Sequence, residues 1–164
     1  MTTDSQRYAG AVGKRLAELG IELPKPTVSP LAKIEGYSKA GEWVYVSGQI
    51  PQWSGDWQYI GKVGRELDLK QGQAAARLCA INVLACAHEA LGGDLDRVIK
   101  LVKVTGYVNC TPDFIEVPLV VNGASELFID VFGQAGRHAR TAVGASVMPF
   151  GVAVEIEATF YVRP

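Results

Sequence analysis

The sequence contains few of the residues that build metal centres or disulfide frameworks. Its 164 residues include three cysteines and two histidines. A structural zinc ion needs about four nitrogen, sulfur or oxygen ligands, so we expect no metal site. Cys79 and Cys86 lie two turns apart on a predicted helix, a separation of about 10 Å that is too long for a disulfide bond. The sequence therefore predicts a protein whose cysteines stay reduced.

The sequence also lacks an excess of charge and long hydrophobic runs. It has 16 lysines and arginines against 17 aspartates and glutamates, for a formal net charge of -1. Because nucleic-acid-binding proteins carry a basic patch or stripe, we expect no nucleic-acid partner. No apolar run reaches about 18 residues, and the N-terminus lacks the basic start and apolar core of a signal peptide. We therefore expect a cytoplasmic protein that does not contact a membrane.

Three common nucleotide-binding and catalytic motifs are missing as well. The sequence has no Gly-x-x-x-x-Gly-Lys-Ser/Thr phosphate loop, no Gly-x-Gly-x-x-Gly after a predicted strand, and no Gly-x-Ser-x-Gly nucleophile elbow. These absences exclude the usual sites of P-loop proteins, dinucleotide-binding domains and α/β-hydrolases. A functional site in this chain must be built from other residues.

The periodicity that is present predicts an α+β fold. Apolar spacing and β-branched or alternating residues indicate helices over 5–19 and 70–91, a third helix ending at Gly133, and strands over 42–48, 98–109, 140–148 and 153–162. The turn at 149–151 predicts that the last two strands form a hairpin. Strands separated by single helices predict a mixed sheet with two long helices on one face. We divide the chain into an N-terminal helix with a proline-rich connector, 1–30, and a single domain, 31–164.

The predicted sheet has a second face that the helices do not cover. This face is half apolar, because aromatic side chains share it with carboxylates. It either faces solvent or packs against another subunit, and we favour the subunit contact because large exposed apolar areas are usually interfaces. The residues that share or border it are Trp43, Tyr45, Glu155, Glu157 and Tyr161.

Arg140 and Glu155 are the leading candidates for a functional site. They lie in the two strands of the predicted hairpin, so tight pairing would place both beside one pocket. The planar fork of an arginine holds a carboxylate through two hydrogen bonds, and a glutamate positions or deprotonates a water molecule. The alternatives are a surface salt bridge for Arg140 and a solvated strand face for Glu155.

Three further residues are candidates for contacting a ligand. Ser47 and Gly48 lie at a strand end, where glycine either lets the backbone approach a ligand or only marks the change from strand to turn. His138 lies two residues before Arg140 and is a candidate for lining the same site.

Two segments carry a resemblance to a known family: the run YVSGQIP at 45–51 and the run HARTAVGASVMPFGVAVEIEA at 138–158. The first is similar to a strand, and the second to the C-terminal signature, of the Rid/YjgF family, which is also called the endoribonuclease L-PSP family. The resemblance covers roughly residues 31–164. It implies a chorismate-mutase-like fold, in which a mixed sheet carries two helices on one face, and a homotrimer with ligand clefts between neighbouring subunits.

The resemblance also implies an activity and a site. Active members of the family hydrolyse reactive imines and enamines to 2-keto acids and ammonia, without a metal or an organic cofactor. The arginine that matches Arg140 grips the substrate carboxylate, and the glutamate that matches Glu155 places the attacking water. The other positions implied to line the cleft are Tyr37, Ser47, Gly48, Asn122 and Ala142, the last standing where the family often has a cysteine.

Two other functions remain open at this point. Ala142, which stands where the family often has a cysteine, is compatible with a trimer that binds a carboxylate or keto acid without turning it over. The family's older name implies an endoribonuclease, and the near-neutral charge of the chain weighs against it.

Overall fold

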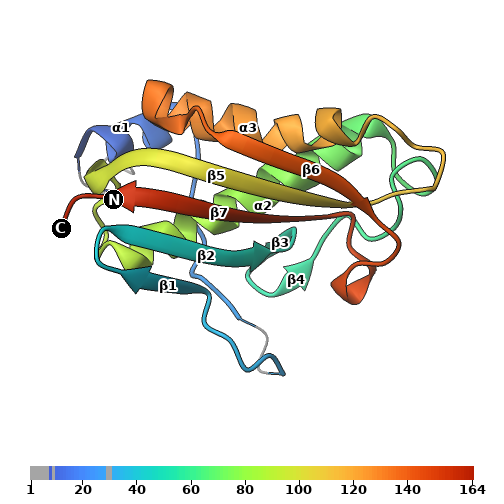
Figure 1. Cartoon of the computed structure of the whole chain (residues 1–164), viewed down its shortest axis with the longest axis horizontal. Helices are drawn as coiled ribbons and strands as arrows, with labels where there is room; N and C mark the ends of the chain where they lie inside the picture. The colour runs from blue at the N-terminus through green and yellow to red at the C-terminus, as the bar shows by residue number, and fades with distance from the viewer. Residues whose placement is uncertain (1–7, 9, 29–30) are drawn as a thin grey trace, which may run out of the picture.

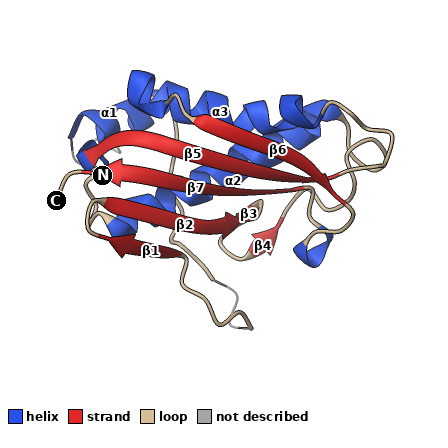
Figure 2. Cartoon of the chain, viewed as in Figure 1, coloured by secondary structure: helices blue, strands red, loops and turns tan. Residues whose placement is uncertain are grey.

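A five-stranded mixed sheet carries two long helices on one face (Figures 1 and 2). The computed structural model describes residue 8 and residues 10–28 and 31–164. The helices are α1 (Gly10–Glu18), α2 (Leu69–Ala90) and α3 (Val117–Phe132), with short 3-10 turns η2 (Leu95–Arg97), η3 (Gly133–Gly136) and η4 (Pro149–Gly151). The strands of the large sheet are β1 (Tyr37–Ala40), β2 (Trp43–Gln49), β5 (Val98–Asn109), β6 (Ala139–Ala145) and β7 (Val154–Val162). Strands β3 (Gln52–Trp53) and β4 (Asp56–Trp57) form a small separate hairpin.

The strand order is β1-β2-β7-β5-β6, and it overturns one prediction from the sequence. Strand β6 pairs in parallel with β5, not with β7, so the predicted C-terminal hairpin is wrong. The reason is the α3 crossover, which returns the chain to lie parallel to the strand it left. Residues 146–153 then carry the chain past the end of β5, and β7 inserts antiparallel between β2 and β5.

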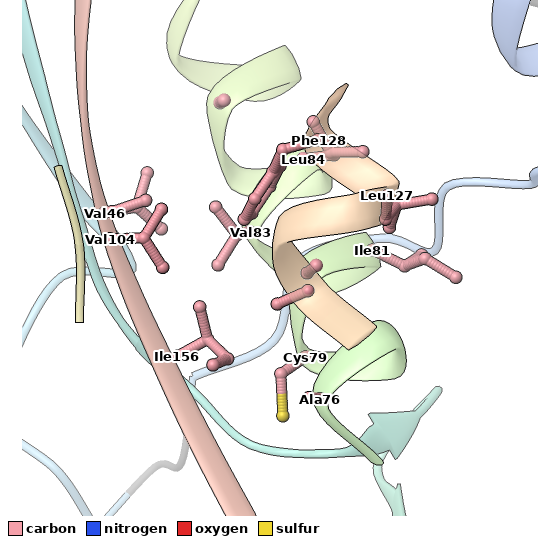
Figure 3. Packing of buried hydrophobic residues seen from close by; sticks show 14 of the residues in the cluster. Val46, Ala76, Cys79, Ile81, Val83, Leu84, Val104, Leu127, Phe128 and Ile156 are labelled. Carbon is pink, nitrogen blue, oxygen red and sulfur yellow. The ribbon is translucent and has the colours of Figure 1, made fainter. Parts of the chain in front are cut away.

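The core lies between the sheet and helices α2 and α3 (Figure 3). Strand β7 alternates strictly between buried and half-buried residues, as its sequence pattern predicts, and its buried side chains meet the helices. Ile156 of β7 and Val104 of β5 face Val83 and Leu84 of α2 across this core, and Phe128 of α3 closes it (Figure 3). Every one of these five side chains is fully buried.

Glycines allow the layers to approach closely at two places. A Cβ added to Gly123 of α3 would overlap the carbonyl oxygen of Gln73 in α2, so the two helices touch through their backbones. A Cβ at Gly106 of β5 would lie 2.6 Å from a methyl carbon of Val121. Helix α3 is therefore seated tightly on both α2 and the sheet, which fixes the side chains that α3 presents toward β6.

The N-terminal segment is anchored to the sheet layer by Asp96. Its carboxylate accepts hydrogen bonds from the backbone N–H groups of Ala11, at 2.7 Å, and Val12, at 2.8 Å, at the start of α1. Leu16 of this helix is fully buried in the core. The helix predicted over 5–19 is observed from Gly10 to Glu18, and residues 5–7 and 9 of that prediction lie outside the described residues.

Within the described ranges, no helix is both long and apolar enough to cross a membrane.

Candidate functional site

Arg140 is held by three uncharged acceptors on helix α3. Its Nη1 donates to Oδ1 of Asn122 at 2.8 Å and to Oγ of Ser125 at 3.1 Å, and its Nη2 donates to the carbonyl oxygen of Pro118 at 3.2 Å. No ion pair of this arginine occurs among the described residues, so it does not form the surface salt bridge considered as an alternative. Three of the five N–H donors of the guanidinium are used in these contacts. The remaining donors and the uncompensated charge suit an anionic ligand.

His138 contacts Ser125 and so acts on Arg140 indirectly. Its Nδ1 lies 2.6 Å from the carbonyl oxygen of Gly136, and its Nε2 lies 2.9 Å from Oγ of Ser125. A carbonyl oxygen only accepts, so Nδ1 carries the proton and Nε2 accepts from the Ser125 hydroxyl. Burial lowers the pKa of His138, and the positive charges of Arg140 and Lys100 lower it further. The neutral imidazole therefore orients Ser125, which in turn presents a lone pair to Arg140.

Sequence reasoning named His138 but missed Ser125. A usable signal was present, because Pro118, Asn122 and Ser125 recur at four and three residues along α3, which places them on one face of the helix. That face looks toward β6. Asn122, predicted to belong with Arg140, is found beside it.

Glu155 occupies a second cluster, which forms around an irregularity in strand β2. The register between β2 and β7 shifts between Val46 and Gln49, which inserts a β-bulge at Ser47 and Gly48. A Cβ added to Gly48 would lie 2.7 Å from Cδ of Glu155 and overlap its Oε1. The carboxylate of Glu155 therefore lies directly over the backbone of Gly48, a position that only glycine permits. Ser47 is fixed beside it, because its Oγ donates to the carbonyl oxygen of Glu35 at 2.7 Å.

The surroundings of Glu155 favour the protonated form of its carboxyl group. Burial raises the pKa of this half-buried carboxyl, and the negative charge of Glu157 two residues away on the same face raises it further. Tyr107 lies opposite Glu155 on β5, and burial together with the two carboxylates raises its pKa. A carboxylate with a raised pKa is a stronger acceptor for a proton of a bound water molecule.

Glu155 opens into the larger of two neighbouring cavities. The first, which we call the Glu155 cavity, has a volume of about 820 Å³ and is lined in part by Ser47, Gly48 and Glu155. The second has a volume of about 540 Å³ and is lined in part by Tyr37, Ser47 and Glu157. Of the predicted site residues, Ser47 and Gly48 are thus brought together with Glu155, whereas Tyr37 lines only the adjoining cavity.

Arg140 and Glu155 do not share a pocket within one chain, contrary to the prediction. Arg140 pairs with Val104, whose side chain is buried under the helices, whereas Glu155 pairs with Tyr107 on the open face. Strand β5 lies between them, and the strand spacing and rise place their backbones roughly 14 Å apart on opposite faces of the sheet. The prediction failed because it required β6 and β7 to pair directly.

The chain therefore presents two separate clusters of polar groups. We call Arg140, Asn122, Ser125 and His138 the arginine half-site, and Ser47, Gly48 and Glu155 the glutamate half-site. Ala142 pairs with Gly106 and lies on the side of the sheet that carries Arg140. The arginine half-site can bind a carboxylate, and the glutamate half-site can orient a water molecule.

No metal-binding arrangement was found in the described part of the chain. No group of three or more histidine, cysteine, aspartate or glutamate side chains there is placed to hold a metal ion. Cys79 is buried under β7, and burial raises the pKa of its thiol well above the ordinary value. Cys110 is half-buried, and burial raises the pKa of its thiol too. Both thiols thus favour the protonated, less reactive form.

Comparison with known proteins places these features in a family. A family model described as "YjgF/chorismate_mutase-like, putative endoribonuclease" matches residues 13–158. Protein TCP17 of Trypanosoma cruzi is 44% identical over 92% of this chain and 93% of its own length.

Two crystal structures show how closely the fold is shared. Protein Atu1372 of Agrobacterium tumefaciens, whose function is unknown, is 43% identical with a TM-score of 0.86, over 93% of each chain. E. coli TdcF with bound serine is 25% identical with a TM-score of 0.58, over 86% of this chain and 94% of its own. The chain is thus more similar in structure to Atu1372 than to TdcF. The predicted α+β fold and family are confirmed, and the chain belongs to the YjgF/chorismate mutase-like family.

Proposed function

We propose that this protein is a 2-imino acid and enamine deaminase that hydrolyses reactive imines to 2-keto acids and ammonia. The site forms between two subunits of a homotrimer, where the arginine half-site of one subunit faces the glutamate half-site of its neighbour. The observation that carries this proposal is the placement of Arg140 and Glu155 on opposite faces of one sheet. Each half has one of the two functions that the reaction needs, and neither is complete alone.

The open face of the sheet supports association into a trimer. Trp43 and Tyr45 of β2 and Val143 of β6 are 39%, 49% and 42% exposed in the single chain. They lie on the face that α2 and α3 leave uncovered. Exposed apolar side chains on one face of this kind are typical of a subunit contact. A contact there would bring the Glu155 side of one sheet toward another copy.

The chemistry follows from the two half-sites. Arg140, already fixed by Asn122 and Ser125, binds the substrate carboxylate and so orients the adjacent C=N carbon. Glu155 accepts a proton as a water molecule adds to that carbon and passes it to the nitrogen. It then carries the proton of the new hydroxyl group to the nitrogen as the C–N bond breaks, the C=O bond forms and ammonia leaves. An enamine first gains a proton on carbon from water and loses one from nitrogen to water, which converts it to the imine. One water is consumed and no electron is transferred, so the hydrolysis needs no redox cofactor.

The bound serine in the related TdcF structure supports the substrate class. Serine carries the carboxylate and the α-nitrogen that a 2-imino acid also carries, and TdcF is 25% identical to this chain. A small molecule that carries a carboxylate and an α-nitrogen is therefore the class of ligand that we propose for this chain.

An assay on freshly generated imines tests the proposal. We expect the protein to accelerate release of 2-keto acid from 2-aminoacrylate or 2-iminobutyrate formed in the cuvette. Arg140→Ala should reduce the rate at least about a hundredfold, because it removes the carboxylate fork. Glu155→Gln should abolish turnover and keep binding of the keto acid product.

Three results would overturn the deaminase proposal in different ways. If no imine from several amino acids is accelerated but keto acids bind with dependence on Arg140, the protein is a carboxylate-binding protein without turnover. If neither turnover nor binding is seen, the pairing of the half-sites is wrong. RNA cleavage that survives Arg140→Ala would favour a ribonuclease instead.

A further inference from the structure

Trp57 and Phe150 form a stacked aromatic pair at the edge of the Glu155 cavity. Their ring centroids are 4.1 Å apart and their planes are inclined by 20°. Trp57 belongs to β4 and Phe150 to the turn η4, two segments that lie beside each other near the end of the sheet (Figure 1). Both side chains line the Glu155 cavity, and they remain 48% and 44% exposed. Two large apolar rings are thus held at the opening of a cavity instead of in the core.

The backbone that carries this pair is strained. Within the described ranges, the non-glycine residues with positive φ are Ser54 (53°), Tyr59 (53°) and Phe150 (57°), which occupy the two segments that carry the pair. An aromatic residue in this region is an outlier, and such outliers persist only where the surroundings enforce them. Two hydrogen bonds tie the segments together, from Gly61 N–H to the Gly151 carbonyl and from Ala153 N–H to the Tyr59 carbonyl, each 2.8 Å long.

The cavity beside the pair is lined by both polar and apolar groups. Glu155 lines it together with Gly48, and Ile34, Ile50 and the aromatic pair contribute apolar surface. Its volume of about 820 Å³ is within the range of pockets that enclose drug-sized ligands. A three-carbon imino acid has about six non-hydrogen atoms and would leave most of this space to water.

We propose that the Trp57–Phe150 pair is the subsite for the substrate side chain, and that the preferred substrates are 2-imino acids with aromatic or large branched apolar side chains. This inference rests on the proposed function, because it requires the C=N carbon of the substrate to lie beside Glu155. The rings of the pair provide a flat apolar surface for stacking, and burial of a large side chain there displaces water from apolar wall atoms.

A series of imines tests this subsite. An L-amino acid oxidase with O2 and catalase converts each L-amino acid to its 2-imino acid, and keto acid release is followed with and without the protein. We expect kcat/KM for the phenylalanine- and leucine-derived imines to exceed that for the alanine-derived imine by at least about tenfold. Trp57→Ala and Phe150→Ala should bring this ratio close to one, and Trp57→Phe should keep most of it. Ile115→Ala, which removes an exposed apolar side chain outside the cavity, should leave the ratio unchanged.

Calorimetric titration of the products separates this inference from the proposed function, because binding needs no turnover. Phenylpyruvate should bind more tightly than pyruvate, and Phe150→Ala should remove the difference. If no imine is hydrolysed but this preference is seen, the deaminase proposal fails and the subsite stands. If all imines are hydrolysed equally with dependence on Arg140, and phenylpyruvate binds no better than pyruvate, the deaminase stands and the subsite is wrong.

Discussion

The carboxylate of Glu155 lies against the backbone of Gly48, in the space that a side chain at residue 48 would occupy. An added Cβ would stand 2.7 Å from Cδ of Glu155 and overlap its Oε1. The bulge in β2 that exposes this glycine is opposite β7, the strand that carries Glu155. The position of the proposed water-activating group thus depends on the absence of a side chain on the neighbouring strand.

Gly48→Ala should therefore destabilise the protein and displace Glu155. We expect a loss of about 1–3 kcal/mol in the free energy of unfolding, as for other substitutions that overfill a packed site. The same substitution in a Glu155→Ala background should cost close to nothing, because the clashing carboxylate is gone. Urea denaturation of the wild type, the two single variants and the double variant, all at the same protein concentration, measures this coupling. Equal costs in both backgrounds would show that the two residues are not in contact.

Glu155→Gln should make the protein more stable at neutral pH and inactive. The pKa of Glu155 in the folded state is raised above its ordinary value of 4.5. The stability linked to its protonation is thus present below pH 4.5 and is lost as the pH rises through the raised pKa. In thermal denaturation measured across pH, the melting temperature of Glu155→Gln should exceed that of the wild type at pH 7. This difference should shrink as the pH falls toward 4.5.

The same pKa sets the expected pH dependence of the rate. Turnover that needs the Glu155 carboxylate should fall on the acid side with a midpoint above 4.5, because protonation removes the acceptor. Turnover that stays constant down to pH 4.5, or a Glu155→Gln protein no more stable than wild type at pH 7, would contradict the role given to this residue.

Ser125→Ala should weaken substrate binding without stopping the chemistry. Ser125 accepts a hydrogen bond from Arg140 and donates one to His138, so its removal frees the guanidinium from one of its three supports. The loss of one such bond is worth about 1 kcal/mol, which predicts a rise of about fivefold in KM with a smaller change in kcat. Ser125→Thr keeps the hydroxyl and serves as the control. A fall in kcat with KM unchanged would mean that Ser125 does not act through Arg140.

Asp96→Ala should loosen the N-terminal helix. The Asp96 carboxylate accepts from two backbone N–H groups at the start of α1, and the loss of a helix cap costs about 0.5–2 kcal/mol. Asp96→Asn keeps one acceptor and should be intermediate. Chemical denaturation measures both variants. Wild-type stability in both would show that α1 does not depend on this carboxylate.

Local sequence signals predicted the helices and strands well, but they predicted the pairing of the strands poorly. The alternation along β7 identified its buried face, and the capping pair Asp68 and Gln71 begins α2 within a residue of the predicted start. Strand pairing depends on contacts far apart in sequence, and β6 has mostly small residues that do not specify a neighbour. The hairpin was therefore predicted where a crossover strand lies, and Arg140 and Glu155 were assigned to one pocket.

The same limit explains which site residues were found. Arg140 and Glu155 were identified because an arginine and a glutamate carry recognisable chemistry and matched a family signature. Ser125 was missed because its role appears only when α3 packs against β6 and brings it between Arg140 and His138. Phe150, which stacks on Trp57, has a positive φ, and no local sequence pattern signals that conformation.

The most direct test of the shared site is to mix two inactive variants. Arg140→Ala and Glu155→Ala subunits are each purified, unfolded together in equal amounts and refolded, and imine hydrolysis is measured. If the two half-sites meet across a subunit boundary, about a quarter of the sites in a random mixture receive both an intact arginine and an intact glutamate half. We therefore predict that the mixture regains about a quarter of the wild-type rate. A mixture as inactive as its parents, with refolding of the wild type as the control, would contradict the account.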